Sequence, residues 1–187
     1  VALWGATVFG PGNSVFGDII EVSGSRVDVT VKGNYFGFDP VTRRLDPQQT
    51  VFDSFSSVGM PTVLVKNNVF AVSSAFPSSW SWDRYPPMRL TFEGNFIGVD
   101  ELGRPFAMQT MGPTFQWAVV FGPNNVVRGT TVGLRLAQPS LVTQNRIFDN
   151  DEGIVYASAP LQPPTITSAR SDGVDGTCAV DGQVEVF

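Results

Sequence analysis

Apolar and polar residues alternate over short stretches along most of the chain, and each stretch meets an asparagine. The recurring pattern is apolar-x-apolar-x-x-Asn-x-apolar, as in Val29, Val31, Asn34 and Phe36. A period of two is typical of a strand with one buried face. Almost no apolar spacing of three and four residues continues over ten residues, so we expect helices to be short or absent.

The alternation is interrupted at the asparagines by residue pairs that suit a tight turn. Gly33-Asn34 and Asn67-Asn68 are two examples, and Gly and Asn tolerate the left-handed backbone conformation that such a turn needs. Alternation resumes directly afterwards in "YFGFD". The pattern therefore predicts a strand, a sharp corner and a second strand.

The chain also repeats itself. "VTVKGNYFGFDPVTRR" (29–44) returns 61 residues later as "LTFEGNFIGVDELGRP" (90–105). "ATVFGPGNSVFG" (6–17) and "AVVFGPNNVVRG" (118–129) agree at 8 of 12 positions. Such self-similarity indicates a repeat architecture, in which each unit buries its apolar face by stacking on the next.

Each interval between corners is interpreted as one coil of a parallel β-solenoid. Residues 1–162 are therefore predicted to form an all-β fold of the single-stranded parallel β-helix type. Successive corner asparagines are 21, 34, 27, 30 and 20 residues apart. The longer middle intervals predict loops inserted at corners, within 43–61, 75–87 and 102–118. Residues 163–187 are expected to form an extended tail or a partial β-sandwich module. The asparagines predicted to share one corner are Asn13, Asn34, Asn68, Asn95, Asn125 and Asn145.

We interpret these asparagines as structural. Stacked amides hydrogen-bond along their column and to the backbone of the corner, which must be satisfied where water is excluded. The phenylalanines are interpreted in the same way. Phe9 with Phe121, and Phe36 with Phe70 and Ile97, are expected to stack as core columns rather than to line a cofactor site.

A resemblance to a known family follows from these motifs. "GNYFGFDPVTRR" and "GNFIGVDELGRP" resemble the Gly-Asn-x-Ile-Gly-x-Asp-x-x-Gly motif of bacterial cell-surface proteins with right-handed parallel β-helix repeats, and "GPNNVVRGTTVGLRL" resembles the neighbouring rung. The resemblance covers about residues 1–160. It implies a right-handed coil and says little about activity. The tail resembles the opening strands of sandwich modules that often follow such repeats, and the aromatic insertions depart from the family pattern.

Composition narrows the class of protein. With 42% apolar and 16% charged residues the chain is expected to be globular. A net charge of −5 argues against nucleic acid or an anionic membrane surface as a partner. No apolar run approaches the ~18 residues of a membrane span. The chain starts at Val1, which suggests a processed or truncated product, and its low charge suits an exported protein.

The residues available for chemistry are few. There is no histidine, which excludes Ser-His-Asp triads and His-ligated metals. Cys178 is the single cysteine, so no disulfide forms within the chain, and no cofactor is expected. Asp39 and Asp100, with Arg43 or Arg104, are the residues that a polysaccharide-degrading enzyme of this fold would use. We favour turn capping for both carboxylates, because Asp commonly holds the next backbone amides.

Two further segments are candidate binding sites. Asp149, Asp151 and Glu152 gather oxygen atoms suited to a weak Ca²⁺ site. "SSWSWDRYPP" presents aromatic rings that stack on sugars or anchor partners, although we favour the interpretation that they fold back over the solenoid wall. The residues assigned to this second site are Trp80, Trp82, Asp83, Arg84 and Tyr85.

The ends of the solenoid suggest how it functions. An open coil exposes unpaired strand edges, and the alternating tail, with Val184, Val186 and Phe187, suits strand donation to a second subunit. The leading hypothesis is a non-enzymatic structural or adhesive protein, extracellular or at the cell surface, that self-associates into homo-oligomers or filaments. The alternatives are a polysaccharide lyase or glycoside hydrolase, and a non-catalytic carbohydrate-binding protein. An ice-binding face is not expected, because no regular Thr-x-Thr ladder is present.

Overall fold

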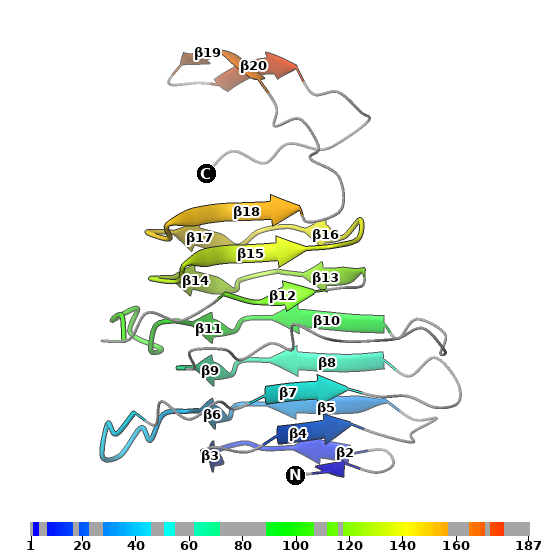
Figure 1. The fold of residues 1–187 in the computed structure, drawn as a ribbon, viewed down its shortest axis with the longest axis vertical. Coiled ribbons are helices and arrows are strands. Elements are labelled where there is room, and N and C mark those ends of the chain that lie inside the picture. The colour runs from blue at the N-terminus through cyan, green and yellow to red at the C-terminus, as the bar shows by residue number, and fades with distance from the viewer. Residues whose placement is uncertain are drawn as a thin grey trace.

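A computed structural model describes most of the repeat region and part of the tail. The described residues are 2–3, 7–16, 19–22, 28–45, 51–54, 62–71, 89–106, 112–115, 118–156, 165–170 and 173–177. Their secondary structure is entirely β, without a helix, and most strands are parallel (Figure 1). The prediction of an all-β fold is therefore confirmed for these residues. None of them forms a helix long and apolar enough to cross a membrane.

Four sheets of parallel strands build the stack. One six-stranded sheet contains β2 (Thr7–Phe9), β5 (Val29–Lys32), β8 (Thr62–Lys66), β10 (Arg89–Glu93), β13 (Val119–Phe121) and β16 (Leu141–Val142). A second contains β3 (Ser14–Val15), β6 (Tyr35–Phe36), β9 (Val69–Phe70), β11 (Phe96–Ile97), β14 (Val126–Arg128) and β17 (Arg146–Phe148). Two three-stranded sheets contain β1 (Ala2–Leu3), β4 (Ile19–Val22) and β7 (Val51–Ser54), and β12 (Thr114–Phe115), β15 (Val132–Leu136) and β18 (Glu152–Tyr156).

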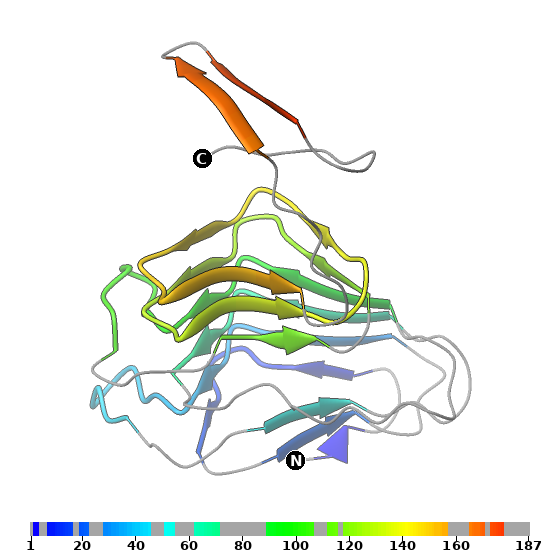
Figure 2. The same ribbon diagram turned by 45° about the horizontal axis from the view of Figure 1, so that its top comes forward.

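The strands follow one another in chain order along the long axis of the molecule (Figures 1 and 2). Each strand of the first six-stranded sheet leads through a corner into a strand of the second, and each pairs with its counterparts in the coils before and after it. Parallel strands that pair only with neighbouring windings are compatible with a parallel β-solenoid.

The corner between the two six-stranded sheets is made by one left-handed residue before each column asparagine. These residues, with their φ angles, are Gly12 (85°), Gly33 (63°), Asn67 (53°), Gly94 (63°), Asn124 (65°) and Gln144 (53°). Gly and Asn reach this conformation at least cost. At Gly94 a side chain is also excluded sterically, since a Cβ atom there would overlap Oδ1 of Asn67 in the coil below.

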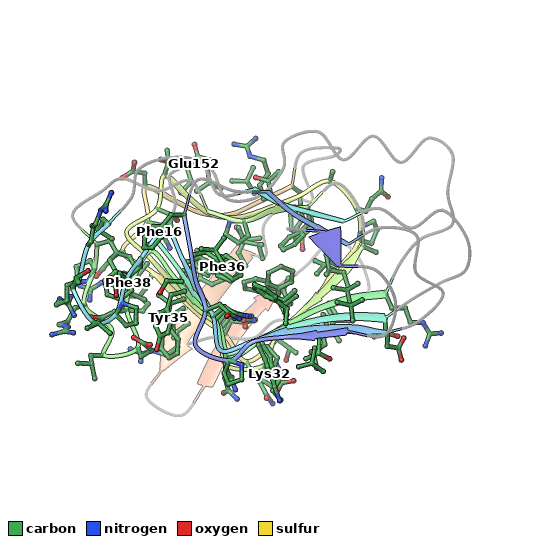
Figure 3. The ribbon with its side chains drawn as sticks, turned by 90° about the horizontal axis from the view of Figure 1, so that it is seen from below. Phe16, Lys32, Tyr35, Phe36, Phe38 and Glu152 are labelled. Carbon is green, nitrogen blue, oxygen red and sulfur yellow. The ribbon has the colours of Figure 1, made fainter. Side chains whose placement is uncertain are left out.

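The core is a set of columns that continue from coil to coil. Phe9, Val31, Val65, Phe92, Phe121 and Val142 are in register along the first six-stranded sheet. Phe36 and Phe70 stack with ring centroids 4.7 Å apart and planes 10° apart, and Ile97 continues their column. Seen along the stack, Phe36 points between the sheets and Lys32 lies outside them (Figure 3). The predicted phenylalanine columns are therefore core packing.

A second apolar cluster lies outside this core. Phe38, Val69 and Ala71 are buried there, against Tyr35, Leu45, Phe96 and Phe106. The rings of Phe38 and Phe106 approach to 5.0 Å between centroids. They come from loops that follow β6 and β11, two coils apart, each closed by an antiparallel bridge. The repeated loops thus pack on each other across the intervening coil, a contact that the repeat pattern did not predict.

The tail contains one hairpin within its described part. β19 (Thr165–Arg170) and β20 (Gly173–Thr177) pair antiparallel, with a register shift between Ile166 and Ser168. Cys178 and the proposed assembly residues Val184, Val186 and Phe187 lie outside the described residues. A partial β-sandwich module therefore stays a prediction.

Candidate functional site

The six column asparagines form one continuous hydrogen-bonded ladder at the corner. Nδ2 of each of the first five donates to Oδ1 of the asparagine in the next coil, at 2.9 Å from Asn13 to Asn34 and at 2.9–3.2 Å in the four later steps. From Asn34 to Asn125 the backbone N–H donates to the same oxygen. From Asn34 onwards Nδ2 also donates to a strand carbonyl of an earlier coil, such as Val65 O for Asn95. All but Asn13 are buried, so the ladder satisfies polar atoms that water does not reach.

A shorter polar column occupies the next corner of the last two coils. Oδ1 of Asn150 accepts hydrogen bonds from the backbone N–H and from the hydroxyl of Thr130, at 3.0 Å and 2.8 Å. The Asn150 amide donates to the carbonyl of Val127 at 3.3 Å. The asparagine-ladder corner and this second corner are therefore both stabilised by side chains that hydrogen-bond within the fold.

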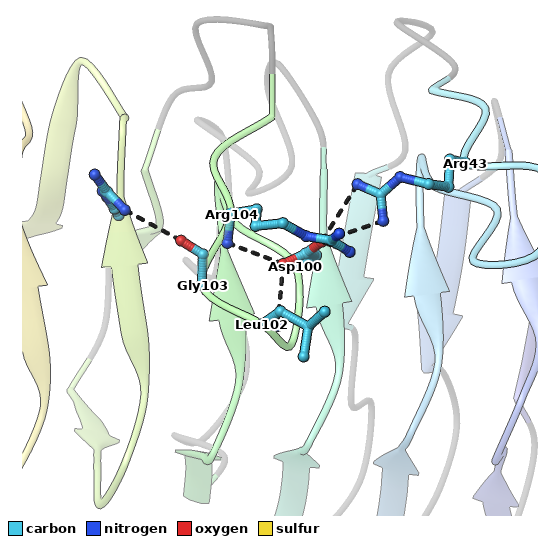
Figure 4. A network of polar contacts seen from close by, with 6 residues as sticks. Arg43, Asp100, Leu102, Gly103 and Arg104 are labelled. Atoms are coloured by element: carbon cyan, nitrogen blue, oxygen red, sulfur yellow. Dashed lines mark hydrogen bonds and ion pairs between the residues drawn. The ribbon is translucent and has the colours of Figure 1, made fainter.

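Among the described residues, a cluster of charged side chains centres on Asp100 (Figure 4). Its side chain is 1% exposed. Oδ1 accepts the backbone N–H groups of Leu102 at 3.0 Å and Arg104 at 2.9 Å, which caps the turn. Oδ2 accepts a hydrogen bond from Nε of Arg104 at 2.7 Å and pairs with its Nη2 at 2.6 Å. It also accepts hydrogen bonds from both terminal nitrogens of Arg43 at 3.3 Å. The carboxylate thus joins two loops that lie 57 residues apart in the sequence.

The electrostatics of this carboxylate oppose acid catalysis. Burial alone would raise the pKa of Asp100, but hydrogen bonds from the Arg104 side chain and from the amides of Arg104 and Leu102 outweigh it, and the pKa lies below its ordinary value. Asp39 also has a lowered pKa, because the Thr42 hydroxyl and the Val41 amide donate to it. A general acid needs a raised pKa to hold its proton near neutral pH. Turn capping, the interpretation favoured from the sequence, describes both residues.

Removing the Asp100 charge is expected to weaken the fold in a pH-dependent way. A depressed folded pKa contributes stability that is complete above the unfolded value of about 3.9 and is lost as the pH falls. Asp100→Asn should therefore cost about 1–2 kcal/mol at pH 7, since hydrogen bonds to charged groups are strong but the guanidiniums here are half exposed. Urea denaturation at pH 7 and at pH 2–3 measures this. A gap between wild type and variant that is as large at pH 2 as at pH 7 would contradict the assignment.

The proposed Ca²⁺ ligands are only partly brought together. Asp149 forms an ion pair with Arg128 at 3.0 Å and has a left-handed φ of 53°. Asp151, just before β18, and Glu152, its first residue, follow as exposed residues. Within the described part of the chain no group of three or more Asp, Glu or Cys side chains is arranged to hold a metal ion. A Ca²⁺ site stays a prediction without geometric support.

An outward stripe on the first six-stranded sheet is the other notable surface. Val8, Thr30, Leu64, Thr91, Val120 and Leu141 are in register along it. Val8 and Leu141 are 60% and 57% exposed. An open groove of about 530 Å³ crosses the stripe near β10, β13 and β16, between Arg89 and Ser140. The stripe is therefore mixed, with four aliphatic side chains and the two threonines Thr30 and Thr91 in one outward row.

A pair of arginines on β14 and β17 was also missed. Arg128 and Arg146 both place their guanidinium carbon over the Phe148 ring, 5.2 Å and 5.1 Å from its centroid. Phe148 lies directly opposite Arg128 in the next coil. The signal was available, because the 20-residue interval between Asn125 and Asn145 places these two residues one above the other.

The proposed aromatic site, Trp80, Trp82, Asp83, Arg84 and Tyr85, lies outside the described residues. Of the predicted enzyme residues, the structure brings Asp100, Arg43 and Arg104 together and leaves Asp39 in its own turn. Comparison of the chain with protein-family models, with curated proteins and with solved structures gave no match.

Proposed function

We propose that this chain is a rigid structural or adhesive β-solenoid of the right-handed parallel β-helix type, which acts outside the cell and associates with further copies of itself. Its described polar residues mainly serve stacking and turn capping. The proposal rests chiefly on the asparagine ladder, which runs through six coils and satisfies its own buried amides. A fold that uses its buried polar atoms in this way is suited to rigidity.

The shape of the stack supports self-association. In the described residues, β16, β17 and β18 each end a sheet and pair on one side only. Unpaired strand edges add strands readily, and repeated head-to-tail addition gives a filament. The alternating apolar residues of the tail would supply such a strand.

The charge cluster favours this proposal over a polysaccharide-degrading enzyme. Asp100 is buried under two guanidiniums and caps its own turn, whereas a catalytic carboxylate must reach its substrate. Carbohydrate binding through the aromatic segment 78–87 stays an alternative, which replacement of Trp80 and Trp82 by alanine addresses directly.

Deletion of residues 163–187 is the experiment that tests assembly. We expect the full chain to show concentration-dependent mass in light scattering and oligomers or filaments in negative-stain electron microscopy, and the deleted chain to remain monomeric. Circular dichroism of the deleted chain controls for the fold. Unchanged assembly would remove the tail from the mechanism, and a full chain that is monomeric at every concentration would overturn self-association.

A further inference from the structure

The outer face of the first six-stranded sheet has charged residues on both sides of the outward stripe. Two positions before the stripe, at β5, β8 and β10, is the leading row, which consists of Asp28, Thr62 and Arg89. Two positions after the stripe is the trailing row, which consists of Lys32, Lys66 and Glu93. Asp28, Lys32 and Arg89 are exposed, and Lys32 lies outside the sheets in Figure 3.

The order of the charges is reversed between two of the coils. At β5 the acid Asp28 leads and the base Lys32 trails, whereas at β10 the base Arg89 leads and the acid Glu93 trails. Four residues of strand separate the two members of each pair by about 13 Å, which is too far for an ion pair within one copy. Among the ion pairs of the described residues, one lies on this face and joins Glu93 to Lys66 at 3.5 Å.

A two-fold axis that runs along the outward stripe, parallel to the stack, matches these charges between two copies of the chain. Such an axis keeps each coil at its own level and makes the strands of the two sheets antiparallel, so the leading row of each copy faces the trailing row of the other. The partner's Lys32 then faces Asp28, and the partner's Glu93 faces Arg89. Facing sheets lie about 10 Å apart, a gap that long basic side chains cross. By symmetry each of these contacts forms twice.

Other arrangements of two copies match the charges less well. A two-fold axis parallel to the strands pairs Lys66 with Glu93 but sets Asp28 and Lys32 opposite uncharged positions. Sliding the second copy by two coils sets Lys32 against Arg89 and Asp28 against Glu93, and like charges that face each other across an interface are unfavourable. The pattern of charge therefore selects one orientation and one register.

The outward stripe supplies the apolar part of the contact. Val8, Val120 and Leu141 of the stripe are exposed, and side chains of this kind fill the space between two packed sheets. The open groove of about 530 Å³ beside Arg89 leaves room for side chains of a second copy. Six strands at a spacing of about 4.8 Å, with about 13 Å between the outer rows, give a total buried area of roughly 1,000 Å², which is small for a specific interface.

We propose that two copies of this chain pair side by side through this face, with their stacks parallel and the strands of the two facing sheets antiparallel. The contact is lateral, so it adds to the end-to-end assembly proposed above and does not depend on the tail. Its small area makes it weak for two single copies, so dilute chains remain unpaired. It becomes stronger where copies joined end to end present several such faces together.

Crosslinking through single cysteines tests the geometry in the full-length chain. Cys178→Ser removes the one native thiol, and Val120→Cys or Thr30→Cys then places a thiol on the stripe. We expect a short bis-maleimide to give covalent dimers with either variant alone, increasingly so over a concentration series, because each stripe residue faces itself across the axis. The axis parallel to the strands would instead set Thr30 opposite Val120, so that only a mixture of the two variants would crosslink.

Charge exchange in the Val120→Cys chain tests the ion pairs. Asp28→Lys and Lys32→Asp each set like charges against each other and should lower the yield of crosslinked dimer about fivefold or more. The two substitutions together restore opposite charges and should return the yield to within about twofold of the starting chain. Since Asp28 and Lys32 are too far apart to pair within one copy, this rescue reports contact between copies.

Glu152→Lys is the matched control for Asp28→Lys. It changes the charge by the same amount at an exposed position on the opposite side of the stack from Lys32 (Figure 3), and it should leave the yield unchanged. Asp28 also accepts the backbone N–H of Thr62 at 2.9 Å, so thermal melting checks the fold of each variant. If the Asp28 variants melt earlier, Arg89→Glu with and without Glu93→Arg repeats the exchange at β10.

Four results would overturn the inference. They are absence of covalent dimers from both single-cysteine chains at every concentration, crosslinking only in the mixture, no rescue by the exchanged charges, and an equal loss in the control. Light scattering of the same samples before crosslinking reports end-to-end assembly separately. Filaments that persist while crosslinking fails would overturn the lateral contact alone.

Discussion

Replacing Asn95 by alanine should lower the free energy of unfolding by about 3–5 kcal/mol. Asn95 is fully buried in the middle of the ladder. Its Oδ1 accepts the backbone N–H of Asn68 at 3.1 Å and the Asn68 amide at 3.0 Å. Its Nδ2 donates to Val65 O and to Asn125 Oδ1, both at 2.9 Å. Alanine leaves all of these groups buried without a hydrogen-bond partner and without water. An unpaired buried polar group costs about 1–3 kcal/mol.

Asn13→Ala is the matched control for this experiment. Asn13 occupies the first position of the ladder and is exposed, and among the described residues its side chain makes one hydrogen bond, to Asn34 at 2.9 Å. We expect its replacement to cost less than about 1 kcal/mol. Urea denaturation followed by circular dichroism measures both variants. Equal and small losses at both positions would show that the ladder contributes little to stability.

Truncating Phe121 to alanine should destabilise the protein by a similar amount, about 3–5 kcal/mol. Phe121 is completely buried, and its ring lies 6.0 Å from that of Phe92 and 6.1 Å from that of Phe115. The strands on both sides of Phe121 are held in register with β13, so neighbouring coils cannot collapse into the cavity without losing that register. The lost contacts and the cavity therefore both add to the cost.

The adjacent residue provides the comparison. Val120 lies on the same strand and faces outward, with 38% of its surface exposed. Val120→Ala should change the free energy of unfolding by no more than about 0.5 kcal/mol. Thermal and urea unfolding of the two variants reveal the difference. A similar loss for both would mean that the inward and outward faces of β13 are assigned incorrectly.

The ladder was accessible to sequence reasoning because each of its requirements is local. A corner needs one residue that tolerates a left-handed backbone and, directly after it, a side chain that both donates and accepts. Gly33-Asn34 and Asn67-Asn68 satisfy both conditions within two residues. Inserted loops change the interval between corners without changing the corner, so the column remained recognisable at irregular spacing.

The contacts between the loops after β6 and β11 could not be predicted from the sequence in that way. Arg43 meets Asp100, and Phe38 meets Phe106, because the loops after β6 and β11 both project past the coil between them. Neither residue lies at a repeat-equivalent position of its partner. The repeat pattern predicts contacts between residues at equivalent positions of different coils, whereas these contacts join residues at positions that are not equivalent.

The period of the coil, the inward phenylalanine and valine columns and the corner asparagines could all be predicted from the amino-acid sequence, since they follow from alternation and from backbone conformation one residue at a time. Which charges meet could be learned only from the folded chain. The burial of Asp100 under two guanidiniums and the grouping of Arg128 with Arg146 on Phe148 depend on how far each loop and long side chain reaches across neighbouring coils. A long flexible side chain on a surface has many positions open to it, and only the packed neighbours select one.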